Sequence, residues 1–219
     1  MPAPRSLEGA VVAVVGVHGG LGAPIADELR SRGAHVIGAG RRDAEVLIDL
    51  RDAAAGHVLV EAARSGYGHL DGVVNAAGIV GFGNLADTDD VVVEELLLTN
   101  ALGPMWLAKS VTPALVATKG FFVNISGVVA EQPMPGMAAY SASKAAAAAA
   151  LAAWRREVRR DRIDVIDIQP PHTETGLASR PLAGTAPALP AGAAPTDVAR
   201  RTVDAIVDRE LLVTADLFA

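Results

Sequence analysis

The sequence predicts an α/β fold in which a doubly wound parallel sheet carries helices on both faces. Short apolar runs, glycine-containing turns and longer stretches with helical spacing follow one another along the chain. Continuous apolar runs are typical of strands covered on both faces, as in a parallel sheet. A chain of 219 residues that alternates in this way is expected to form one domain, residues 1–219, with right-handed crossovers.

The first expected strand is residues 10–15 (AVVAVV), which is apolar throughout. An amphipathic helix is expected at residues 21–32, and Gly33 is its expected end. Similar short runs predict strands at residues 35–39, 45–49, 70–75, 120–125 and 164–169, with a last short strand in the tail 210–219. Helical spacing predicts helices at residues 53–65, 89–118, 141–160 and 196–208.

One segment, residues 170–195, fits neither pattern. It is rich in proline, alanine, glycine and threonine, which suits either a linker or a flap over a binding site. Because a helical stretch follows it, we expect a mobile substrate loop that belongs to the same domain.

Composition excludes several classes of function. The 25 acidic and 19 basic side chains give a net charge of −6, which disfavours a nucleic-acid binder. The chain has no cysteine, so thiolate zinc sites and a cysteine nucleophile are excluded, and we expect no metal. The longest unbroken apolar run, residues 145–154, is too short to span a bilayer, and residues 1–10 lack the apolar stretch of a signal peptide. We therefore expect a cytoplasmic protein with no membrane partner.

A glycine-rich loop joins the first expected strand to the first expected helix. Gly16, Gly20 and Gly22 form the spacing G-x-x-x-G-x-G, with His18 and Leu21 between them. Such a loop lets a phosphate approach the backbone, and the following helix offers free N–H groups and the positive end of its dipole. A plain glycine turn is the alternative, but the position between strand and helix favours a dinucleotide site.

Three further motifs follow in order: Asn75-Ala76-Ala77-Gly78, then Asn100, then Tyr140-Ser141-Ala142-Ser143-Lys144. With the glycine loop, they make the chain similar to the short-chain dehydrogenase/reductase family, from about Leu7 to Thr175. The resemblance implies a Rossmann-type fold and an oxidoreductase that interconverts a carbonyl and a secondary alcohol with a nicotinamide nucleotide. The resemblance, together with the chemistry of His18, Arg41 and Arg42 towards phosphates, predicts a nucleotide site formed by Gly16, His18, Gly20, Leu21, Gly22, Arg41, Arg42, Asp49, Leu50, Asn75, Ala76, Gly78, Tyr140, Lys144, Pro170, Thr173 and Thr175.

The residues after the second expected strand favour NADP(H) over NAD(H). Family members that use NAD carry an acid where this chain has Gly40, and Arg41 and Arg42 follow. A guanidinium can hold the 2′-phosphate of NADP with two parallel hydrogen bonds, although both arginines could also be solvated turn residues. Asp49 matches the family's contact with the adenine amino group; a helix-capping role, for which Asp52 competes, is the alternative.

The catalytic residues expected from the resemblance are Tyr140, Lys144 and Asn100; Ser126 is added because a local turn could bring its hydroxyl into the site, although its strand position should point it to the other face. Tyr140 and Lys144 lie one helical turn apart, so they share a face. A free phenol has a pKa near 10, and a neighbouring ammonium together with the positive nicotinamide ring would lower it, making Tyr140 a usable acid–base. In the family, Asn100 kinks its helix and holds a water that relays protons to Lys144; a helix-bending asparagine is the alternative.

The match fails at the family's catalytic serine, whose position is Gly127 here. Loss of one such donor typically costs on the order of 3 kcal/mol in catalysis. Ser126, Gln132 and His172 are the alternative donors, and Gly127→Ser is expected to raise activity. The same loss supports a second hypothesis, a dinucleotide-binding sensor or structural protein with little turnover.

The expected partners are a small carbonyl or alcohol substrate and further copies of the chain. The stretch ASKAAAAAALAAW at residues 142–154 has small side chains on every side, so another helix could approach it closely. In the family, the helices that carry Asn100 and Tyr140 form the subunit interface. We therefore expect a homodimer or homotetramer with a two-fold axis.

Overall fold

Seven parallel strands form the centre of the molecule, which the computed structural model describes for residues 3–218. Their bounds are β1 Val11–Val15, β2 His35–Gly40, β3 Val46–Leu47, β4 Gly72–Asn75, β5 Phe121–Ile125, β6 Asp164–Ile168 and β7 Leu212–Val213. They lie in the order β3-β2-β1-β4-β5-β6-β7. The order reverses between β1 and β4, and in open α/β sheets ligands bind outside the carboxyl ends of the strands at this point.

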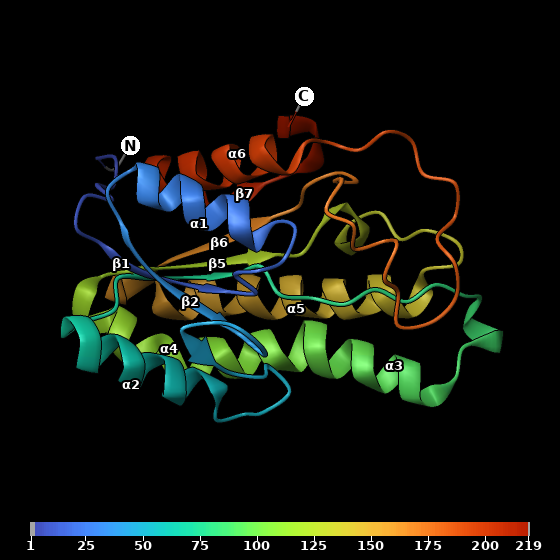
Figure 1. Cartoon of the computed structure of the whole chain (residues 1–219), viewed down its shortest axis with the longest axis horizontal. Coiled ribbons are helices and arrows are strands. Elements are labelled where there is room, and N and C mark those ends of the chain that lie inside the picture. Colours follow the sequence, from blue (N-terminus) through green and yellow to red (C-terminus); the bar gives the residue numbers. More distant parts are fainter. Residues whose placement is uncertain (1–2, 219) are drawn as a thin grey trace.

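Helices cover both faces of the sheet (Figure 1). Their bounds are α1 Gly22–Ser31, α2 Ala55–Tyr67, α3 Asp90–Leu97, α4 Gly103–Thr118, α5 Ala138–Glu157 and α6 Pro195–Asp208. Helices α1 and α6 lie on one face, and α2, α4 and α5 lie on the other. The predicted doubly wound Rossmann-type sheet in a single domain is confirmed.

Each strand is buried on both faces, as its unbroken apolar run predicts. In β1, Val12 and Val14 pack against the α1 and α6 side, whereas Ala13 and Val15 pack against the side of α2 and α4. All of these side chains are almost fully buried. Because alternate residues of a strand face opposite ways, two apolar cores form from one strand.

The long helix expected at residues 89–118 contains an interruption. Between α3 and α4, the segment Leu98–Leu102 is a π-helix, a wider turn that is rare outside functional sites. Pro104, at the start of α4, has no N–H to donate to the α-helical partner carbonyl, that of Asn100. Helix α5 begins at Ala138, earlier than expected, and ends before a short 3₁₀ segment, Val158–Asp161.

The continuous helical stretch Asp90–Thr118 is long and apolar enough to cross a bilayer by length and composition. Within its most apolar window, 44% of the residues are buried inside the fold. A buried core helix passes the same criterion, so this measure does not place the chain in a membrane.

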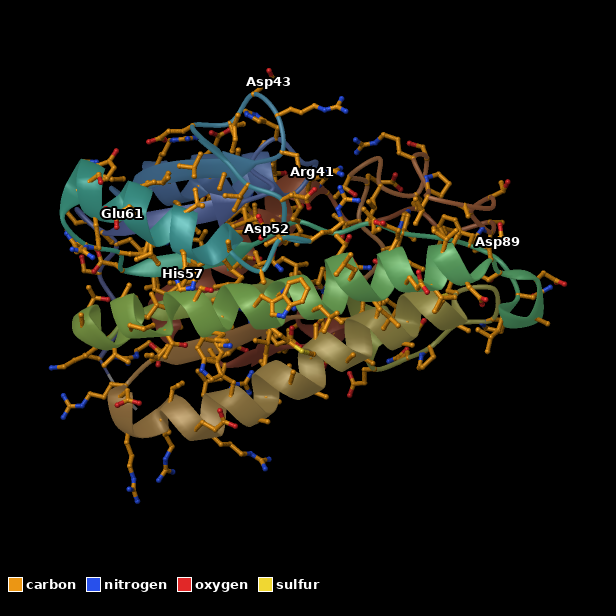
Figure 2. All side chains as sticks on the ribbon, turned by 90° about the horizontal axis from the view of Figure 1, so that it is seen from below. Arg41, Asp43, Asp52, His57, Glu61 and Asp89 are labelled. Atoms are coloured by element: carbon orange, nitrogen blue, oxygen red, sulfur yellow. The ribbon has the colours of Figure 1, made fainter. Side chains whose placement is uncertain are left out.

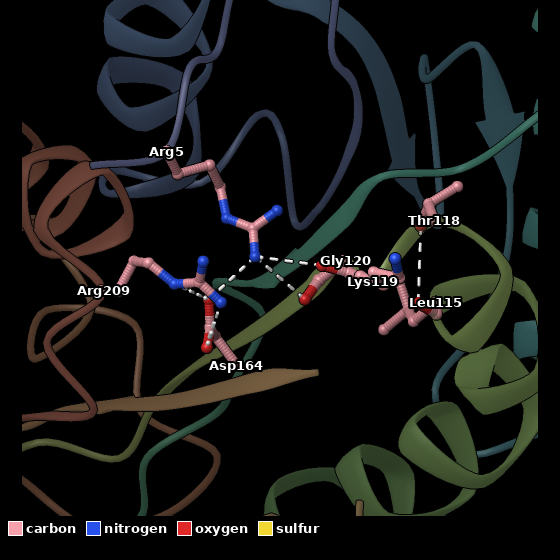
Figure 3. Close-up of polar contacts among 7 residues, drawn as sticks. All are labelled: Arg5, Leu115, Thr118, Lys119, Gly120, Asp164 and Arg209. Carbon is pink, nitrogen blue, oxygen red and sulfur yellow. Dashed lines mark hydrogen bonds and ion pairs between the residues drawn. The ribbon is translucent and has the colours of Figure 1, made fainter. Parts of the chain in front are cut away.

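Three charged side chains close the amino edge of the sheet (Figure 3). Asp164, the first residue of β6, accepts from Arg5 at 2.7 Å and from Arg209 at 3.1 Å. Arg5 also donates to the carbonyls of Lys119 and Gly120 and lies over the ring of Phe121. These contacts tie the N-terminal segment and the end of α6 to the start of two central strands.

Candidate active site

The glycine loop lies between the turn after β4 and the segment after β6. Gly16 has φ +80°, and a Cβ there would lie 2.9 Å from Ala77. A Cβ at Gly20 would collide with the backbone of Thr175, and one at Gly22 with the carbonyl of Gly16. Only glycine therefore permits these approaches, which bring three segments of the predicted site together.

Helix α1 begins directly after this loop; in its first turn the N–H groups of Ala23 and Ile25 donate to the carbonyls of Gly19 and Leu21, and Pro24 has no N–H. Leu21, at the N-cap, provides no side-chain cap, and no acidic residue lies in the first turn. An anion can therefore approach the backbone of the glycine loop and the positive end of the helix dipole. A glycine loop without obstructing side chains, followed by an uncapped helix N-terminus, fits the pyrophosphate of a dinucleotide.

The turn after β2 carries Arg41 and Arg42, both exposed. Asp43 lies at the outer end of this turn (Figure 2), with a positive φ of 52°. His18 of the glycine loop is hydrogen-bonded through Nε2 to the carbonyl of Asp43, at 2.8 Å. His18 thus fixes the turn relative to the glycine loop, a role that the sequence did not suggest.

Asp49, the expected contact for adenine, is bound to Arg51. The two side chains form several hydrogen bonds, the shortest of 2.7 Å, and Arg51 also donates to Glu95 of α3. The hydrogen bond from Arg51 holds the pKa of Asp49 below its usual value. The adjacent Leu50 is buried and supports Gly103 of α4 by close backbone contact.

Asn75 and Ala76 lie where β4 ends, beside the glycine loop. The N–H of Ala76 donates to the carbonyl of Val15, so the turn stays in register with β1. A Cβ at Gly78 would lie 3.2 Å from both Asn100 Oδ1 and Lys144 Nζ. The turn after β4 therefore reaches two of the expected catalytic residues, and a larger residue at Gly78 would crowd both.

Asn100 lies in the π-helical segment and connects three elements. Its Nδ2 donates to the carbonyl of Ile79 at 2.8 Å and to Ser143 Oγ at 3.0 Å, while its Oδ1 accepts from the N–H of Ile79. Ser143 in turn donates to the carbonyl of Tyr140. The wider turn thus directs Asn100 towards α5, and Ile79 and Ser143 are its partners, which the motif analysis did not identify.

Tyr140 and Lys144 lie side by side on the buried face of α5 near its start. Tyr140 belongs to an apolar cluster with Val80, Phe82 and Val129. Lys144 Nζ donates to the carbonyl of Ile125 at the end of β5, at 2.8 Å. Lys144 therefore lies at the carboxyl edge of the sheet beside Gly78, with Tyr140 one helical turn before it.

Burial dominates the electrostatics of this pair. It raises the pKa of the Tyr140 phenol to about 12, because the ionised form would lack water. It lowers the pKa of the Lys144 ammonium to about 8, and the nearby carboxylate of Asp167 opposes this effect. The lowered phenol pKa expected for a working enzyme stays a prediction for the state with nucleotide bound.

The segment after β5 has a backbone that only glycine adopts readily. Gly127 has φ +82° and ψ 160°, and nothing lies within 4 Å of its missing Cβ. Space is therefore available, but a serine there would be strained in this conformation. The expectation that Gly127→Ser simply restores a hydroxyl must be corrected, because the backbone would also have to change.

None of the three alternative donors is free beside Tyr140. Ser126 is fully buried, and its hydroxyl points to the carbonyl of Ile168 at 3.5 Å. Gln132 is exposed, and His172 lies 3.5 Å from the carboxylate of Glu174. A catalytic role for Ser126 stays a prediction that none of these contacts supports.

The loop at residues 170–195 folds back over the cluster around Tyr140. Near its base, Pro170 accepts from Val128, Thr173 donates to the carbonyl of Pro171, and Thr175 accepts from the N–H of Leu177. Further along, Leu182 donates to Val80, and Phe82 donates to Ala183. The loop therefore packs against the apolar cluster that contains Tyr140; its role towards a substrate and its mobility stay predictions.

The sequence motifs did not indicate Asp167, whose charge acts on Lys144, or its partner Gln169. Both are buried, and Gln169 Nε2 donates to Asp167 Oδ2 at 3.0 Å. The available signal was a carboxylate inside the apolar run of residues 164–169, where a buried strand ordinarily has none.

Comparison with known proteins agrees with this arrangement. The model of the short chain dehydrogenase family matches residues 10–181. A dehydrogenase/reductase SDR family protein 7-like of Anopheles gambiae is 31% identical, in an alignment that covers 94% of this chain and 74% of that relative.

Solved structures show the same fold. A short chain dehydrogenase from Burkholderia cenocepacia J2315, in complex with NADP, has a TM-score of 0.84 and 25% identity, with 96% of this chain and 90% of that chain covered. A short chain dehydrogenase/reductase from Burkholderia phymatum, in complex with NAD, has a TM-score of 0.86 at 21% identity over the same shares of the two chains.

Proposed function

Because the chain belongs to the short-chain dehydrogenase family, we propose that it is an NAD(P)(H)-dependent oxidoreductase that interconverts a carbonyl and a secondary alcohol. One observation carries the proposal: Tyr140, Lys144 and Asn100 come together at the carboxyl edge of the sheet, the edge at which the glycine loop follows β1. This is the place where a parallel sheet of this topology binds its ligand.

Tyr140 gives a proton to the carbonyl oxygen during reduction and takes it back during oxidation. Lys144 supplies the positive charge that makes the phenol a better acid, and it bonds the ribose of the nucleotide. Asn100 holds the helix open at the π-helical segment and links Lys144 to solvent. The nicotinamide nucleotide, when bound, supplies or accepts the hydride.

NADP(H) is the cofactor we favour. Arg41 and Arg42 are exposed on a turn that His18 ties to the glycine loop, and Gly40 offers no carboxylate to repel a phosphate. Replacing both arginines with alanine should raise the KM for NADPH about tenfold or more, with a much smaller effect for NADH. An equal loss for both nucleotides would contradict the preference.

A second candidate function rests on Gly127. Without a serine hydroxyl at this position, a protein could bind the nucleotide and turn over little or no substrate, as a sensor or structural partner. We favour the enzyme because a retired site has no need of a buried lysine beside a phenol.

A carbonyl panel with NADPH, followed at the nicotinamide absorbance, separates the two functions. Tyr140→Phe should lower kcat/KM by about 10²–10⁴-fold, as expected for loss of a general acid. The chain offers a matched control in its other tyrosine: Tyr67 is 40% exposed at the end of α2, and Tyr67→Phe should leave activity unchanged. Tight NADPH binding without turnover of any carbonyl would favour the sensor.

The assembly is part of the same proposal. A groove of about 480 Å³ lies between α4 and α5 and is lined by Met105, Lys109, Pro113, Trp154 and Glu157, among others. We propose that a second copy packs on this face, giving a homodimer or homotetramer of a cytoplasmic protein. Light scattering at micromolar concentration should show a mass of two or four chains, and a monomer would contradict the proposal.

A further inference from the structure

A row of polar side chains crosses three strands beneath α5. Asn75 of β4 lies directly opposite Asn124 of β5, and Asn124 lies directly opposite Asp167 of β6. All three are 4% exposed or less, and Asn75 Nδ2 donates to Asn124 Oδ1 at 2.9 Å. Because buried polar groups are costly unless they are bonded, such a row in a core indicates a role besides packing.

The ammonium of Lys144 lies close to this row. Its acceptor, the carbonyl of Ile125, belongs to the β5 residue that pairs with Ile168 of β6. That pair comes one position after the pair of Asn124 with Asp167. Successive residues of a strand are about 3.3 Å apart, and neighbouring strands are about 4.8 Å apart. The carbonyl that binds Lys144 is therefore separated from Asp167 by about one strand spacing and one residue spacing.

Asp167 is the acid available to Lys144 in this part of the molecule. The other elements packed around the ammonium present neutral groups: Asn100 from the π-helical segment, Asn124 from β5 and the phenol of Tyr140 from α5. The acids and the base of the flanking segments point elsewhere: Glu94, Glu131 and Lys109 are exposed, and Glu95 is bound to Arg51. A second cation on α5, Arg155, donates to the carbonyls of Val165 and Leu211; burial lowers its pKa, and Asp167 opposes this effect as it does for Lys144.

The carboxylate of Asp167 is incompletely bonded. Gln169 donates to its Oδ2, whereas Oδ1 is buried and has no hydrogen-bond partner among residues 3–218. No ion pair of 4 Å or less joins it to Lys144 in that part of the chain. The carboxylate of Asp167 therefore acts on the Lys144 ammonium through space. In a protein interior without water, such an electrostatic interaction is much stronger than in water. In agreement, Asp167 opposes the effect of burial on the pKa of Lys144.

We propose that Asp167 is the buried counter-ion of Lys144, a positioning residue that keeps this ammonium protonated at the nucleotide site. The assignment deepens the proposed function and rests on it for its catalytic meaning. The effect of Asp167 on the titration of Lys144 is a property of the protein itself and can be measured without nucleotide or substrate.

The test is a titration of lysine side chains by NMR in the protein without nucleotide. The chain has three lysines, Lys109, Lys119 and Lys144, so lysine labelled with ¹³C at Cε gives three signals, and Lys144→Arg identifies the third. In Asp167→Asn, the midpoint of the Lys144 titration should move to lower pH by about one pH unit. Asp167→Glu, which keeps the charge, should leave it close to the original value.

The matched control lies on the same strand. Asp164→Asn removes a carboxylate at the opposite end of β6, so it should leave the Lys144 midpoint in place even where it weakens the fold. If Asp167→Asn does not fold, Asp167→Val takes its place in the same titration. An unchanged midpoint in the Asp167 variants, or an equal movement in Asp164→Asn, would overturn the assignment.

A second readout connects the charge to turnover. In the pH profile of kcat/KM for carbonyl reduction, the alkaline limb should move to lower pH in Asp167→Asn and stay unmoved in Asp164→Asn. A midpoint that moves in a protein that reduces no carbonyl would uphold the counter-ion and defeat the proposed enzyme. An unchanged Lys144 midpoint in Asp167→Asn of a protein that reduces carbonyls would support the proposed enzyme and contradict the counter-ion.

Discussion

Two aspartates on one strand meet opposite environments. Asp164 begins β6 at the amino edge and lies between two guanidinium groups, those of Arg5 and Arg209. Asp167 lies three residues further along the strand, beneath α5. Its Oδ2 accepts from the Gln169 amide, and its Oδ1 has no hydrogen-bond partner among residues 3–218. The sequence presents both as acids in the same apolar run, and the fold gives them different functions.

The difference shows where this molecule uses charge for stability and where it keeps charge for chemistry. At the amino edge, both guanidinium groups are paired with Asp164, and Arg209 Nε lies 2.9 Å from its carboxylate; among residues 3–218, Arg5 Nε has no hydrogen-bond partner. At the carboxyl edge, four side-chain oxygens lack a hydrogen-bond partner within the described part of the chain, those of Asn75, Ser141, Asp167 and Gln169. Unsatisfied buried oxygens are costly in a core and are common where a ligand or water completes a site.

The largest expected effect lies at the amino edge. Asp164→Asn leaves two guanidinium groups without their carboxylate, and breaking a largely buried ion pair costs several kcal/mol. We expect the free energy of unfolding to fall by about 2–4 kcal/mol in urea denaturation, while kcat of the folded protein stays within about threefold. A large loss of kcat at unchanged stability would erase the distinction between the two edges.

A smaller effect is expected at the carboxyl edge from the backbone of Gly127. Gly127→Ser forces a side chain into a conformation with φ +82°, which costs about 1–3 kcal/mol. We expect the free energy of unfolding to fall by that amount. We expect no gain in carbonyl reduction, because the backbone around residue 127 must change conformation to accommodate serine. Gly66→Ser is the control: it adds the same side chain at a helical glycine with open space around it. A clear gain in activity would show that the hydroxyl alone was missing.

The smallest effect concerns pH. Burial lowers the pKa of Lys144 to about 8, below its value in the unfolded chain, so the unfolded chain binds more protons between pH 8 and pH 10.5. Stability should therefore rise with pH across this window, by about 1–2 kcal/mol between pH 8 and pH 9.5. The raised pKa of Tyr140 acts in the other direction, but only above pH 10.

Denaturation of the native protein and of Lys144→Met at both pH values isolates this contribution. The rise should be present in the native protein and absent in the variant, since all other groups are shared. If the free energy of unfolding changes equally with pH in the native protein and in Lys144→Met, the Lys144 ammonium is hydrated rather than buried. The carboxyl edge would then differ less from the amino edge.

Much of this fold follows from local patterns in the sequence. The continuous apolar runs of β1 and β5 identified central strands, and Gly16, Gly20 and Gly22 identified the loop at the nucleotide edge, because only glycine permits the contacts seen there. These features depend on neighbours in the chain or on backbone conformation, so their signal is local.

The features that escaped prediction depend on distant contacts. The resemblance predicted a kink at Asn100, but not the partners that hold the π-helical segment, Ile79 and Ser143, which come from two other segments. Arg51 bonds to Asp49 and Glu95 because α3 lies beside the end of β3. Asn124 lies opposite Asp167 because of the register between β5 and β6. No periodicity encodes such relations, which appear only when the sheet is assembled.

The π-helical segment also indicates how this site could be removed from the fold. Its turn closes over one more residue than an α-helical turn, so it amounts to an insertion inside one long helix. Deleting Thr99 would return the stretch to ordinary winding and keep α3 and α4 continuous, but Asn100 would rotate away from α5. A single codon thus separates a plain structural helix from one that serves the site.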